Sequence, residues 1–311
     1  MVTILGSSLL FALLKRSANG YVRESAILIL SLCLFIISPI SIWMDDPHMT
    51  GYVNPTIWHS PTYNALRLFI VPVSLLSLRI VDGSRYRDVN QRIFFLLLTA
   101  SLISLATLAK PSNLIALIPG LCLLVAYRVV KSQPVDWALL FLGIILPGAV
   151  LLALQYLITY EDGGGIQFGL FTLLRLWLPI WQIPIRLILS LAFPLSVYVL
   201  YFSEARKHTY LNMSWLIFFV GLGYMYFLTE NSWRFYHSNF NWTAYSVIFA
   251  LMYASVQFLV ERRVAERRRK LQDGHGTRGR LSMRFAVVAS LFGLHVIFGI
   301  IYFFRFQLFP V

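Results

Sequence analysis

Residues 93–131 read IFFLLLTASLISLATLAKPSNLIALIPGLCLLVAYRVVK, an apolar stretch with one polar break at Lys110-Pro111-Ser112-Asn113. A helix needs about 20 apolar residues to cross the hydrocarbon core of a bilayer, so the stretch is long enough for two crossings. Proline is tolerated at the start of a helix, because its missing N–H would have no partner there. The stretch therefore predicts two membrane-spanning helices that are joined by a tight turn.

Apolar runs of similar length recur along the rest of the chain. Of the 311 residues, 58% are hydrophobic and only 13% are charged, whereas a soluble domain has about a quarter of its residues charged. In lipid, an α-helix satisfies all of its backbone hydrogen bonds within its own segment, so each apolar run can cross as a helix. We therefore predict an all-α, polytopic transmembrane protein that forms a single domain over residues 1–311. About ten spans are expected, at residues 1–14, 24–44, 65–81, 93–109, 114–131, 137–160, 180–203, 213–229, 242–261 and 284–304.

The net charge of +13 comes from basic residues in short connectors between the apolar runs. If the spans alternate, these residues share one compartment, which the positive-inside bias identifies as the cytoplasm. The longest such connector is a basic loop at 262–284, whose first half is expected to continue the preceding helix. Basic residues in this pattern touch anionic membrane lipids, and we expect no nucleic-acid partner. The residues on this side are Lys15, Arg16, Arg23, Arg79, Arg85, Arg87, Arg92, Arg128, Lys131, Arg206, Lys207 and the cluster from Arg262 to Arg284.

The first run has two interpretations. It begins at Met1, and its basic residues Lys15 and Arg16 follow the apolar run, whereas those of a signal peptide would precede it. Either the chain starts outside the cytoplasm, or a span and a loop precede it in a longer protein. Both interpretations give the same sidedness for the remaining connectors.

The two cysteines, Cys33 and Cys122, both lie inside apolar runs. We interpret them as small core residues and expect neither a structural disulfide nor a cysteine-based zinc site. No resident cofactor or metal centre is predicted, although a divalent cation at Asp45, Asp46 and His48 is possible.

The first large outer connector, residues 45–64, reads DDPHMTGYVNPTIWHSPTYN. Aspartate and histidine next to a span can act as general bases, metal ligands or sugar contacts. A structural interpretation is also open: Asn54-Pro55-Thr56 and Ser60-Pro61-Thr62 each resemble a helix N-cap with proline at the next position. Tyr52, Trp58 and Tyr63 would then belong to an interfacial aromatic belt. The candidate site residues in this connector are Asp45, Asp46, His48, Asn54 and His59.

Two further outer segments carry isolated charges. Lys110 either pairs with an anionic group of a substrate or extends to the membrane interface. After the sequence YEDGGG at 160–165, a stretch rich in tryptophan and proline predicts an amphipathic helix on the outer interface. An arginine within a span costs about 2.5–3.5 kcal/mol on insertion scales, so Arg186 needs a polar partner, either an acidic side chain or a lipid-linked phosphate. The candidates here are Lys110, Glu161, Asp162, Arg175 and Arg186.

The last outer connector, residues 230–242, reads ENSWRFYHSNFNW. Aromatic faces stack on sugar rings, whereas amides and carboxylates bind hydroxyl groups, although any interfacial loop is also rich in aromatic residues. The candidates in this segment are Glu230, Arg234, His237 and Asn239.

Three short stretches resemble the GT-C group of membrane glycosyltransferases. They are Trp58-His59-Ser60-Pro61-Thr62-Tyr63, Lys110-Pro111-Ser112 and the segment 230–242, each of which enters a helix. The resemblance implies an inverting transfer from a polyprenyl-phosphate-linked sugar on the outer face, with a carboxylate as base and cationic residues around the phosphate. It gives Asp45 or Asp46 as base and Lys110, Arg186 and Arg234 as phosphate contacts, with Glu230, His59 and His237 contacting the acceptor. That group usually carries its acid in its first outer loop, so a missing upstream segment would remove the true base.

The sequence thus favours a membrane glycosyltransferase of cell-surface polysaccharide assembly, with a lipid-linked sugar donor as its partner, in a bacterial inner membrane with its active face outside the cytoplasm. Two alternatives stay open. A carrier or flippase for a lipid-linked or anionic solute is compatible with the Gly and Pro residues that interrupt several spans. A non-catalytic membrane subunit is compatible with the unusual N-terminus.

Overall fold

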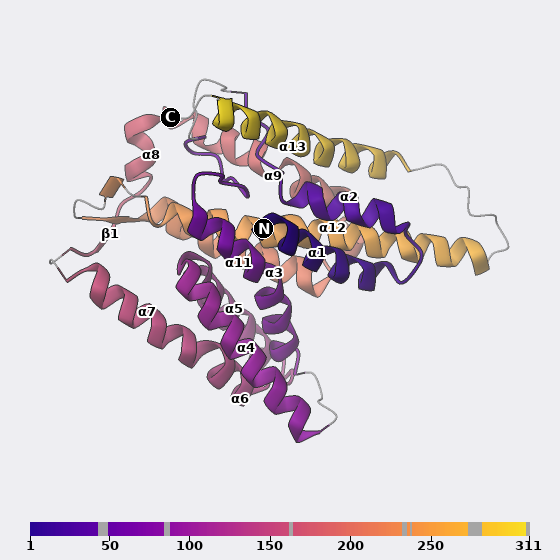
Figure 1. The fold of residues 1–311 in the computed structure, drawn as a ribbon, viewed down its shortest axis with the longest axis horizontal. Coiled ribbons are helices and arrows are strands. Elements are labelled where there is room, and N and C mark those ends of the chain that lie inside the picture. Colours follow the sequence, from indigo (N-terminus) through magenta and orange to yellow (C-terminus); the bar gives the residue numbers. More distant parts are fainter. Residues whose placement is uncertain are drawn as a thin grey trace. The chain divides into compact units, whose positions relative to one another are not determined.

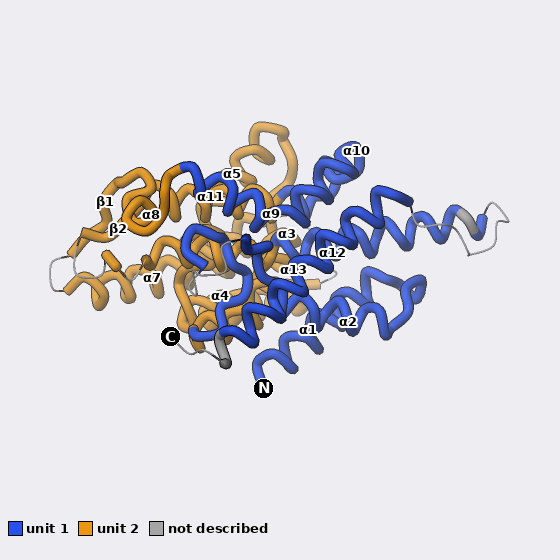
Figure 2. Tube along the Cα trace, turned by 90° about the horizontal axis from the view of Figure 1, so that it is seen from above, with its two compact units in different colours: residues 1–59, 181–212, 251–311 blue, residues 60–180, 213–250 orange. Residues whose placement is uncertain are grey.

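The computed structural model describes residues 1–42, 49–83, 88–161, 164–231, 235–236, 238–272 and 282–308. Within them the fold is helical, with a single two-stranded sheet (Figure 1). The chain divides into two compact units, which are coloured separately in Figure 2. Unit 1 comprises residues 1–59, 181–212 and 251–311, and unit 2 comprises residues 60–180 and 213–250.

Each unit is built from helices, and two helices run from one unit into the other. Unit 1 contains α1 (Val2–Ala18), α2 (Glu24–Leu34), α9 (Gln182–Leu200), α10 (Phe202–Ala205) and α13 (Met283–Leu308). Unit 2 contains α3 (Pro61–Val81), α4 (Val89–Ala109), α5 (Ser112–Val130), α6 (Trp137–Leu140), η1 (Phe141–Ile145), α7 (Leu146–Thr159), β1 (Ile166–Phe168), α8 (Thr172–Trp177) and β2 (Leu228–Glu230). The two shared helices are α11 (Thr209–Phe227) and α12 (Asn241–Gln272).

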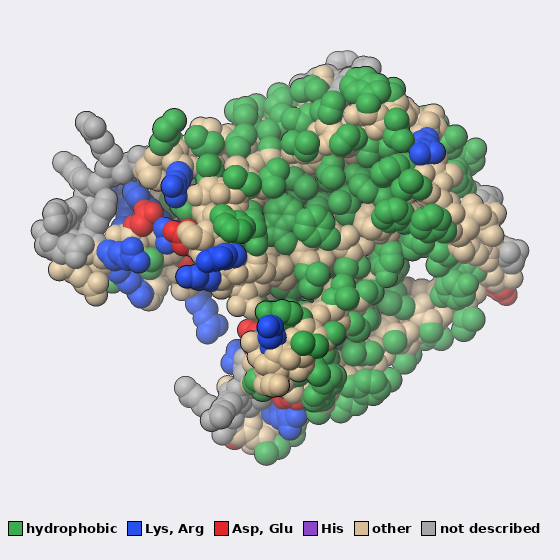
Figure 3. Space-filling model, turned by 180° about the vertical axis from the view of Figure 1, so that it is seen from behind, with side chains coloured by type: hydrophobic (Ala, Val, Ile, Leu, Met, Phe, Trp, Pro, Cys, Tyr) green, Lys and Arg blue, Asp and Glu red, His purple; other side chains and the backbone are tan. Residues whose placement is uncertain are grey.

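Eight helices of the described chain are long and apolar enough to cross a membrane, as judged by length and composition. They coincide with the eight runs predicted from residue 65 onward, and the predicted turn between α4 and α5 is present. Hydrophobic side chains cover most of the face drawn in Figure 3. In α4 only 22% of the most apolar window is buried, against 83% in α12. An exposed apolar surface of this extent is expected of helices that face lipid.

The prediction of about ten spans is not confirmed, and the predicted helix over 24–44 is wrong. Helix α2 ends at Leu34, and residues 35–42 form irregular buried backbone. Proline disfavours a helical conformation for the residue before it, which explains why Ser38-Pro39 cannot continue the helix. The first predicted span corresponds to α1, which has 17 residues and is not among the eight apolar helices.

Neighbouring helices of unit 1 satisfy the backbone of this irregular segment. The N–H of Ser38 donates to the carbonyl of His295 at 3.1 Å, and the Nδ1–H of His295 donates to the carbonyl of Ser38 at 2.7 Å. Further along, the N–H of Val53 donates to Oγ of Ser190 at 2.9 Å. Non-helical backbone is tolerated at membrane depth only where protein groups replace the missing helical bonds. Residues 35–41 and 49–57 are therefore integral parts of the core of unit 1.

In the first outer connector, one residue has the role expected from the sequence and three do not. Ser60 caps α3 as predicted, because its Oγ accepts a hydrogen bond from the N–H of Tyr63 at 3.3 Å. Asn54 does not begin a helix; its Oδ1 accepts from the N–H of Thr56 at 2.9 Å within a turn. Tyr52 and Tyr63 are completely buried, so the interpretation of these two as belt residues is wrong. Outside this connector, Cys122 is exposed and is not a core residue.

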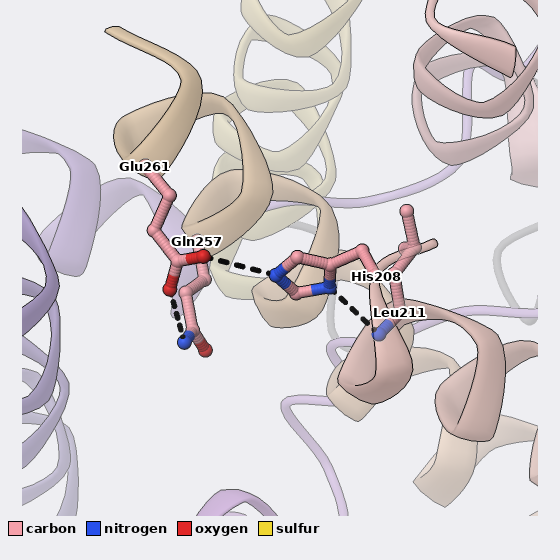
Figure 4. Close-up of polar contacts among 4 residues, drawn as sticks. All are labelled: His208, Leu211, Gln257 and Glu261. Carbon is pink, nitrogen blue, oxygen red and sulfur yellow. Dashed lines mark hydrogen bonds and ion pairs between the residues drawn. The ribbon is translucent and has the colours of Figure 1, made fainter. Parts of the chain in front are cut away.

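Ionic and polar contacts gather at one end of unit 1, where the basic residues lie. Figure 4 shows His208 between α11 and α12. Its Nδ1 accepts from the N–H of Leu211 at 3.1 Å, so we infer that the proton is on Nε2, which lies 3.0 Å from Oε2 of Glu261. Arg262 pairs with Glu204 at 3.0 Å, and Arg267 donates to the carbonyl of Tyr21. The α1–α2 turn and the basic end of α12 therefore lie together, and α12 continues into the basic loop as predicted.

Ion pairs also gather at one end of unit 2. Arg128 pairs with Asp82 at 2.7 Å, and Arg92 pairs with Asp136 at 2.8 Å. Both pairs join connectors at the ends of the helices that lie away from the α4–α5 turn. The basic connectors thus gather at one end of each unit.

We predict that Gly299→Ala destabilises the protein, because an added Cβ would collide with the backbone carbonyl of Ile36. Overpacking of this kind costs about 1–3 kcal/mol, and a backbone atom cannot rotate away. Thermal unfolding in detergent, followed by size-exclusion chromatography, should give a lower midpoint for this variant.

Gly293→Ala on the same helix is the matched control, because an added Cβ there meets no atom within 4 Å. Its midpoint should be unchanged or higher, since alanine favours helix over glycine. Equal midpoints for both variants would contradict the packing of α13 against residues 35–42.

Candidate binding cavity

A cavity of about 460 Å³ lies in unit 2, at the end opposite the basic connectors. It is formed where α4 ends and α5 begins, where α7 ends, and where β2 leads into α12. Its size lies within the range of pockets that bind small molecules or parts of larger ligands. The lining residues are Lys110, Pro111, Ser112, Ile115, Leu152, Ala153, Gln155, Tyr156, Thr159, Tyr160, Ile166, Glu230, Asn239, Phe240 and Trp242.

Lys110 supplies the positive charge of the cavity. It follows the last residue of α4 in an extended conformation, and its Nζ lies 3.7 Å from the centroid of the Trp242 ring. Lys110 forms no ion pair with any residue in the described part of the chain. Burial lowers the pKa of its ammonium group to about 8, because desolvation disfavours the charged form. Lys110 is therefore mostly charged at neutral pH and is available to an anionic ligand.

Glu230 supplies a buried carboxylate at the end of β2. The strand pairs with β1 in antiparallel register, and Ile166 lies opposite Glu230. One carboxylate oxygen accepts a hydrogen bond from Oη of Tyr160 at 2.6 Å, and the other accepts from Nδ2 of Asn239 at 2.7 Å. Only 3% of Glu230 is exposed. The two donors hold the carboxylate in place, while each oxygen keeps a lone pair for a ligand hydroxyl.

The glycines after α7 bring the chain back to this carboxylate. The N–H of Gly165 donates to Oδ1 of Asn231 at 2.7 Å, and the N–H of Asn231 donates to the carbonyl of Gly165 at 3.1 Å. These bonds extend the pairing of β1 with β2 by one residue.

Aromatic rings form much of the cavity wall. Trp242 packs against Tyr63 at a centroid distance of 5.7 Å, and the Tyr63 hydroxyl donates to the carbonyl of Tyr245 at 2.6 Å. The rings of Tyr156 and Tyr160, one helical turn apart, pack in a tilted arrangement with their centroids 4.7 Å apart. With Ile115, Leu152 and Phe240, these rings give the cavity a largely apolar lining that surrounds a few polar groups. Such a surface fits an amphipathic ligand better than a small hydrated ion.

Two uncharged polar side chains complete the lining. Gln155 donates from Nε2 to the carbonyl of Thr107 at 3.1 Å, which links α7 to α4. Ser112 is 3% exposed, and its Oγ has no hydrogen-bond partner among the described residues. A buried hydroxyl without a partner destabilises the fold. Its position in a cavity wall allows a ligand to supply the missing partner.

The cavity brings together three of the residues selected from the sequence: Lys110, Glu230 and Asn239. It adds Gln155, Tyr156 and Tyr160, which the sequence analysis did not select. Gln155 could have been found as a lone amide within an apolar run. The tyrosines carry no such signal, because aromatic residues are common near the ends of any span.

The other described candidates lie outside this cavity. Glu161 and Arg175 belong to unit 2, but both are exposed and neither lines the cavity. The exposed His59 and the buried Asn54 belong to unit 1. The remaining candidates lie outside the described residues; they are Asp45, Asp46, His48, Asp162, Arg234 and His237. Their roles stay predictions.

Arg186 is buried in unit 1, where it contacts the irregular backbone that begins at residue 49. Its Nη1 donates to the carbonyl of Thr50 at 2.6 Å, and its Nη2 donates to Oε1 of Gln182 at 2.9 Å. The guanidinium group also lies 4.9 Å from the centroid of the Tyr52 ring. Arg186 therefore has uncharged polar partners at Thr50 and Gln182, and an acidic or phosphate partner stays a prediction. Arg186 lies within α9, which begins at Gln182, and the outer helix predicted before it is reduced to the six residues of α8.

A second buried arginine, Arg67 of α3, was missed by the sequence analysis. It is 2% exposed, and its guanidinium group lies 4.8 Å from the centroid of the Phe249 ring in the same unit. The signal was present, because an arginine interrupts the apolar stretch that follows Asn64.

No group of three or more His, Cys, Asp or Glu side chains suited to a metal ion occurs among the described residues. Asp45, Asp46 and His48 lie outside the described residues, so a divalent cation at these residues stays a prediction.

Comparisons with protein-family models, curated proteins and solved structures gave no match to the chain. The resemblance to GT-C glycosyltransferases therefore rests on the short stretches quoted above.

We predict that Lys110 titrates near pH 8, because burial disfavours its charged form. The lysines of the chain are Lys15, Lys110, Lys131, Lys207 and Lys270. Reductive ¹³C-methylation followed by NMR should give one resonance that titrates about two units below the usual lysine value of about 10.4. Lys110→Arg should remove that resonance, whereas Lys131→Arg should leave it. An unshifted titration for Lys110 would contradict its burial.

Proposed function

We propose that the protein is a membrane glycosyltransferase that transfers a sugar from a polyprenyl-phosphate-type donor. The observation that carries the proposal is the cavity in unit 2, where Lys110 and the Glu230–Asn239 pair share one aromatic-walled space. A cation suits the phosphate of such a donor. The carboxylate and amide suit the hydroxyls of a sugar, and the aromatic walls suit its ring and the first isoprene units.

The reaction that fits these groups is an inverting displacement. The acceptor hydroxyl oxygen attacks the anomeric carbon, the bond from that carbon to the phosphate oxygen breaks, and the polyprenyl phosphate leaves with the bonding electrons. The hydroxyl proton passes to a carboxylate base, for which Asp45 or Asp46 stays the first candidate. Lys110 stabilises the charge on the leaving phosphate, and Glu230 with Asn239 orients the sugar.

Charge distribution supports an outer location for the cavity. The pairs Arg128–Asp82 and Arg92–Asp136 lie at the opposite end of unit 2 from Lys110. If the eight apolar helices alternate in direction across a membrane, the basic connectors share one side. The positive-inside bias then places that side in the cytoplasm and the cavity outside it. For a protein of envelope polysaccharide assembly, the membrane would be the bacterial inner membrane.

Glu230→Gln is expected to lower kcat/KM for sugar transfer about 10- to 100-fold, which corresponds to losing a charge-assisted hydrogen bond. The amide remains isosteric and can still interact with Tyr160 and Asn239, so folding should be retained. Release of radiolabelled sugar from a short-chain prenyl-phosphate donor, by purified protein in lipid nanodiscs, measures the effect.

Glu24→Gln is the matched control, because Glu24 is exposed at the basic end of unit 1, where it pairs with Lys15 at 2.7 Å. Its rate should equal that of the wild type. The Asp45→Asn/Asp46→Asn double variant should lose transfer but retain membrane insertion. Wild-type transfer by both Glu230→Gln and the double variant would refute the mechanism.

A carrier for a lipid-linked solute is the second candidate. It is favoured by the buried irregular backbone of residues 35–42 and by the π-helical turn η1 within the span 137–159, since broken helices are frequent in transporters. Proteoliposomes that contain only this protein separate the two functions. Movement of a labelled prenyl-phosphate sugar between leaflets without release of the sugar would favour the carrier.

A further inference from the structure

The start of α5 combines an N-terminus without a side-chain cap and two buried side chains that have polar atoms without partners in the described chain. The N-cap residue is Pro111, which has no side chain able to cap the helix. The first N–H groups of any helix lack partners within it, and α5 is a full span of 19 residues. The N–H of Leu114 donates to the carbonyl of Pro111 at 3.0 Å, so the N-terminus presents the N–H groups of Ser112 and Asn113 together with the positive end of a helix dipole.

Ser112 gives independent support for a ligand at this position. It lines the cavity and is only 3% exposed, and its Oγ has no partner within the described chain. Beside it, Nδ2 of the buried Asn113 also lacks a partner in the same part of the chain. Buried polar groups are nearly always hydrogen-bonded. A hydroxyl left unsatisfied in a cavity wall thus points to an acceptor supplied by a ligand.

Lys110 adds a full positive charge to this position. It is two residues from Ser112 and lines the same cavity, and its contact with Trp242 holds the ammonium group over an aromatic wall. A lysine, a serine hydroxyl and a helix N-terminus together form a binding site for phosphate oxygens.

We propose that the N-terminus of α5, with Lys110 and the Ser112 hydroxyl, binds the phosphate group of a prenyl-type lipid. This inference rests on the proposed function and adds an orientation to it. The phosphate lies at α5, the sugar lies beside Glu230 and Asn239, and the prenyl chain follows the apolar side chains of Ile115 and Leu152.

Binding of farnesyl phosphate to the purified full chain in nanodiscs tests this inference without any sugar transfer. Ser112→Ala should weaken binding roughly tenfold, as expected for one hydrogen bond to a charged group. Because this hydroxyl has no partner in the described chain, its removal costs no internal hydrogen bond and should not impair folding. Lys110→Met should weaken binding by at least about tenfold for the same electrostatic reason.

Two controls lie on the same helical hairpin, outside the cavity. Lys131→Met removes the exposed lysine that follows the other end of α5, and Ser101→Ala removes an exposed hydroxyl of α4. Both should bind farnesyl phosphate as the wild type does.

Two further ligands test which part of the lipid is recognised. Farnesol should bind weakly, because it lacks the phosphate, and inorganic phosphate should bind weakly, because it lacks the chain.

The affinity should also fall as the pH rises above about 8, where Lys110 loses its proton, while the phosphate keeps its charge. Lys110→Arg should extend binding to higher pH, because guanidinium stays charged. Wild-type affinity in both Ser112→Ala and Lys110→Met would overturn the inference. Equal affinity for phosphatidylglycerol would also overturn it, by assigning the site to bulk lipid headgroups.

The outcomes separate this inference from the proposed function. Binding that follows the predicted pattern in a protein that transfers no sugar would retain the phosphate site and reject the glycosyltransferase. If the protein transfers sugar but neither substitution changes its affinity for farnesyl phosphate, the glycosyltransferase would be retained and the phosphate site rejected.

Discussion

The cost of placing charge in hydrocarbon determines where function can reside in this chain. A charged side chain at the centre of a bilayer costs several kcal/mol, so charged groups either gather at the ends of helices or are buried with polar partners. The chain follows both rules. The ion pairs seen among the described residues lie at the basic ends of the two units, and the buried Arg186 and Arg67 contact a carbonyl and an aromatic ring. Lys110, at the end of α4, and Glu230, buried with Tyr160 and Asn239, follow the same rules, but both line a cavity.

A break between two helices positions Lys110, and the pairing of two strands positions Glu230. The Lys110-Pro111 break ends α4 and starts α5, so a lysine and a helix N-terminus become neighbours. The β1–β2 pairing then fixes Glu230, which receives hydrogen bonds from Tyr160 and Asn239. Short-range structure thus accounts for the position of Lys110. The position of Glu230 depends on strand pairing between segments more than sixty residues apart, and the common location of both groups depends on how α4, α5, α7 and α12 pack within unit 2.

The span prediction succeeded where length and composition were sufficient. From residue 65 onward every apolar run became a helix, because lipid permits few alternatives. It failed at 35–42, where donors and acceptors from α9 and α13 replaced the helical bonds. The sequence contained Ser38-Pro39 as a warning, but the partner His295 lies more than two hundred residues away. No local pattern could have identified that contact.

The site prediction was limited in the same way. Lys110 was selected as an isolated charge in an outer segment, and Glu230 and Asn239 were selected because carboxylates and amides bind hydroxyl groups. Tyr160 and Gln155 became informative only when tertiary packing placed them in the same cavity wall. Conversely, Asn54 and Arg186 had the right chemistry, but their polar atoms hold the backbone of unit 1.

The central claim is that the cavity opens on the side of the membrane opposite the basic connectors. Single cysteines in a chain without Cys33 and Cys122 test this directly, with an impermeant maleimide applied to intact cells. Glu161→Cys, at the exposed end of α7, should label in intact cells, whereas Lys131→Cys should label only after permeabilisation. Labelling of both positions from the same side would contradict the account.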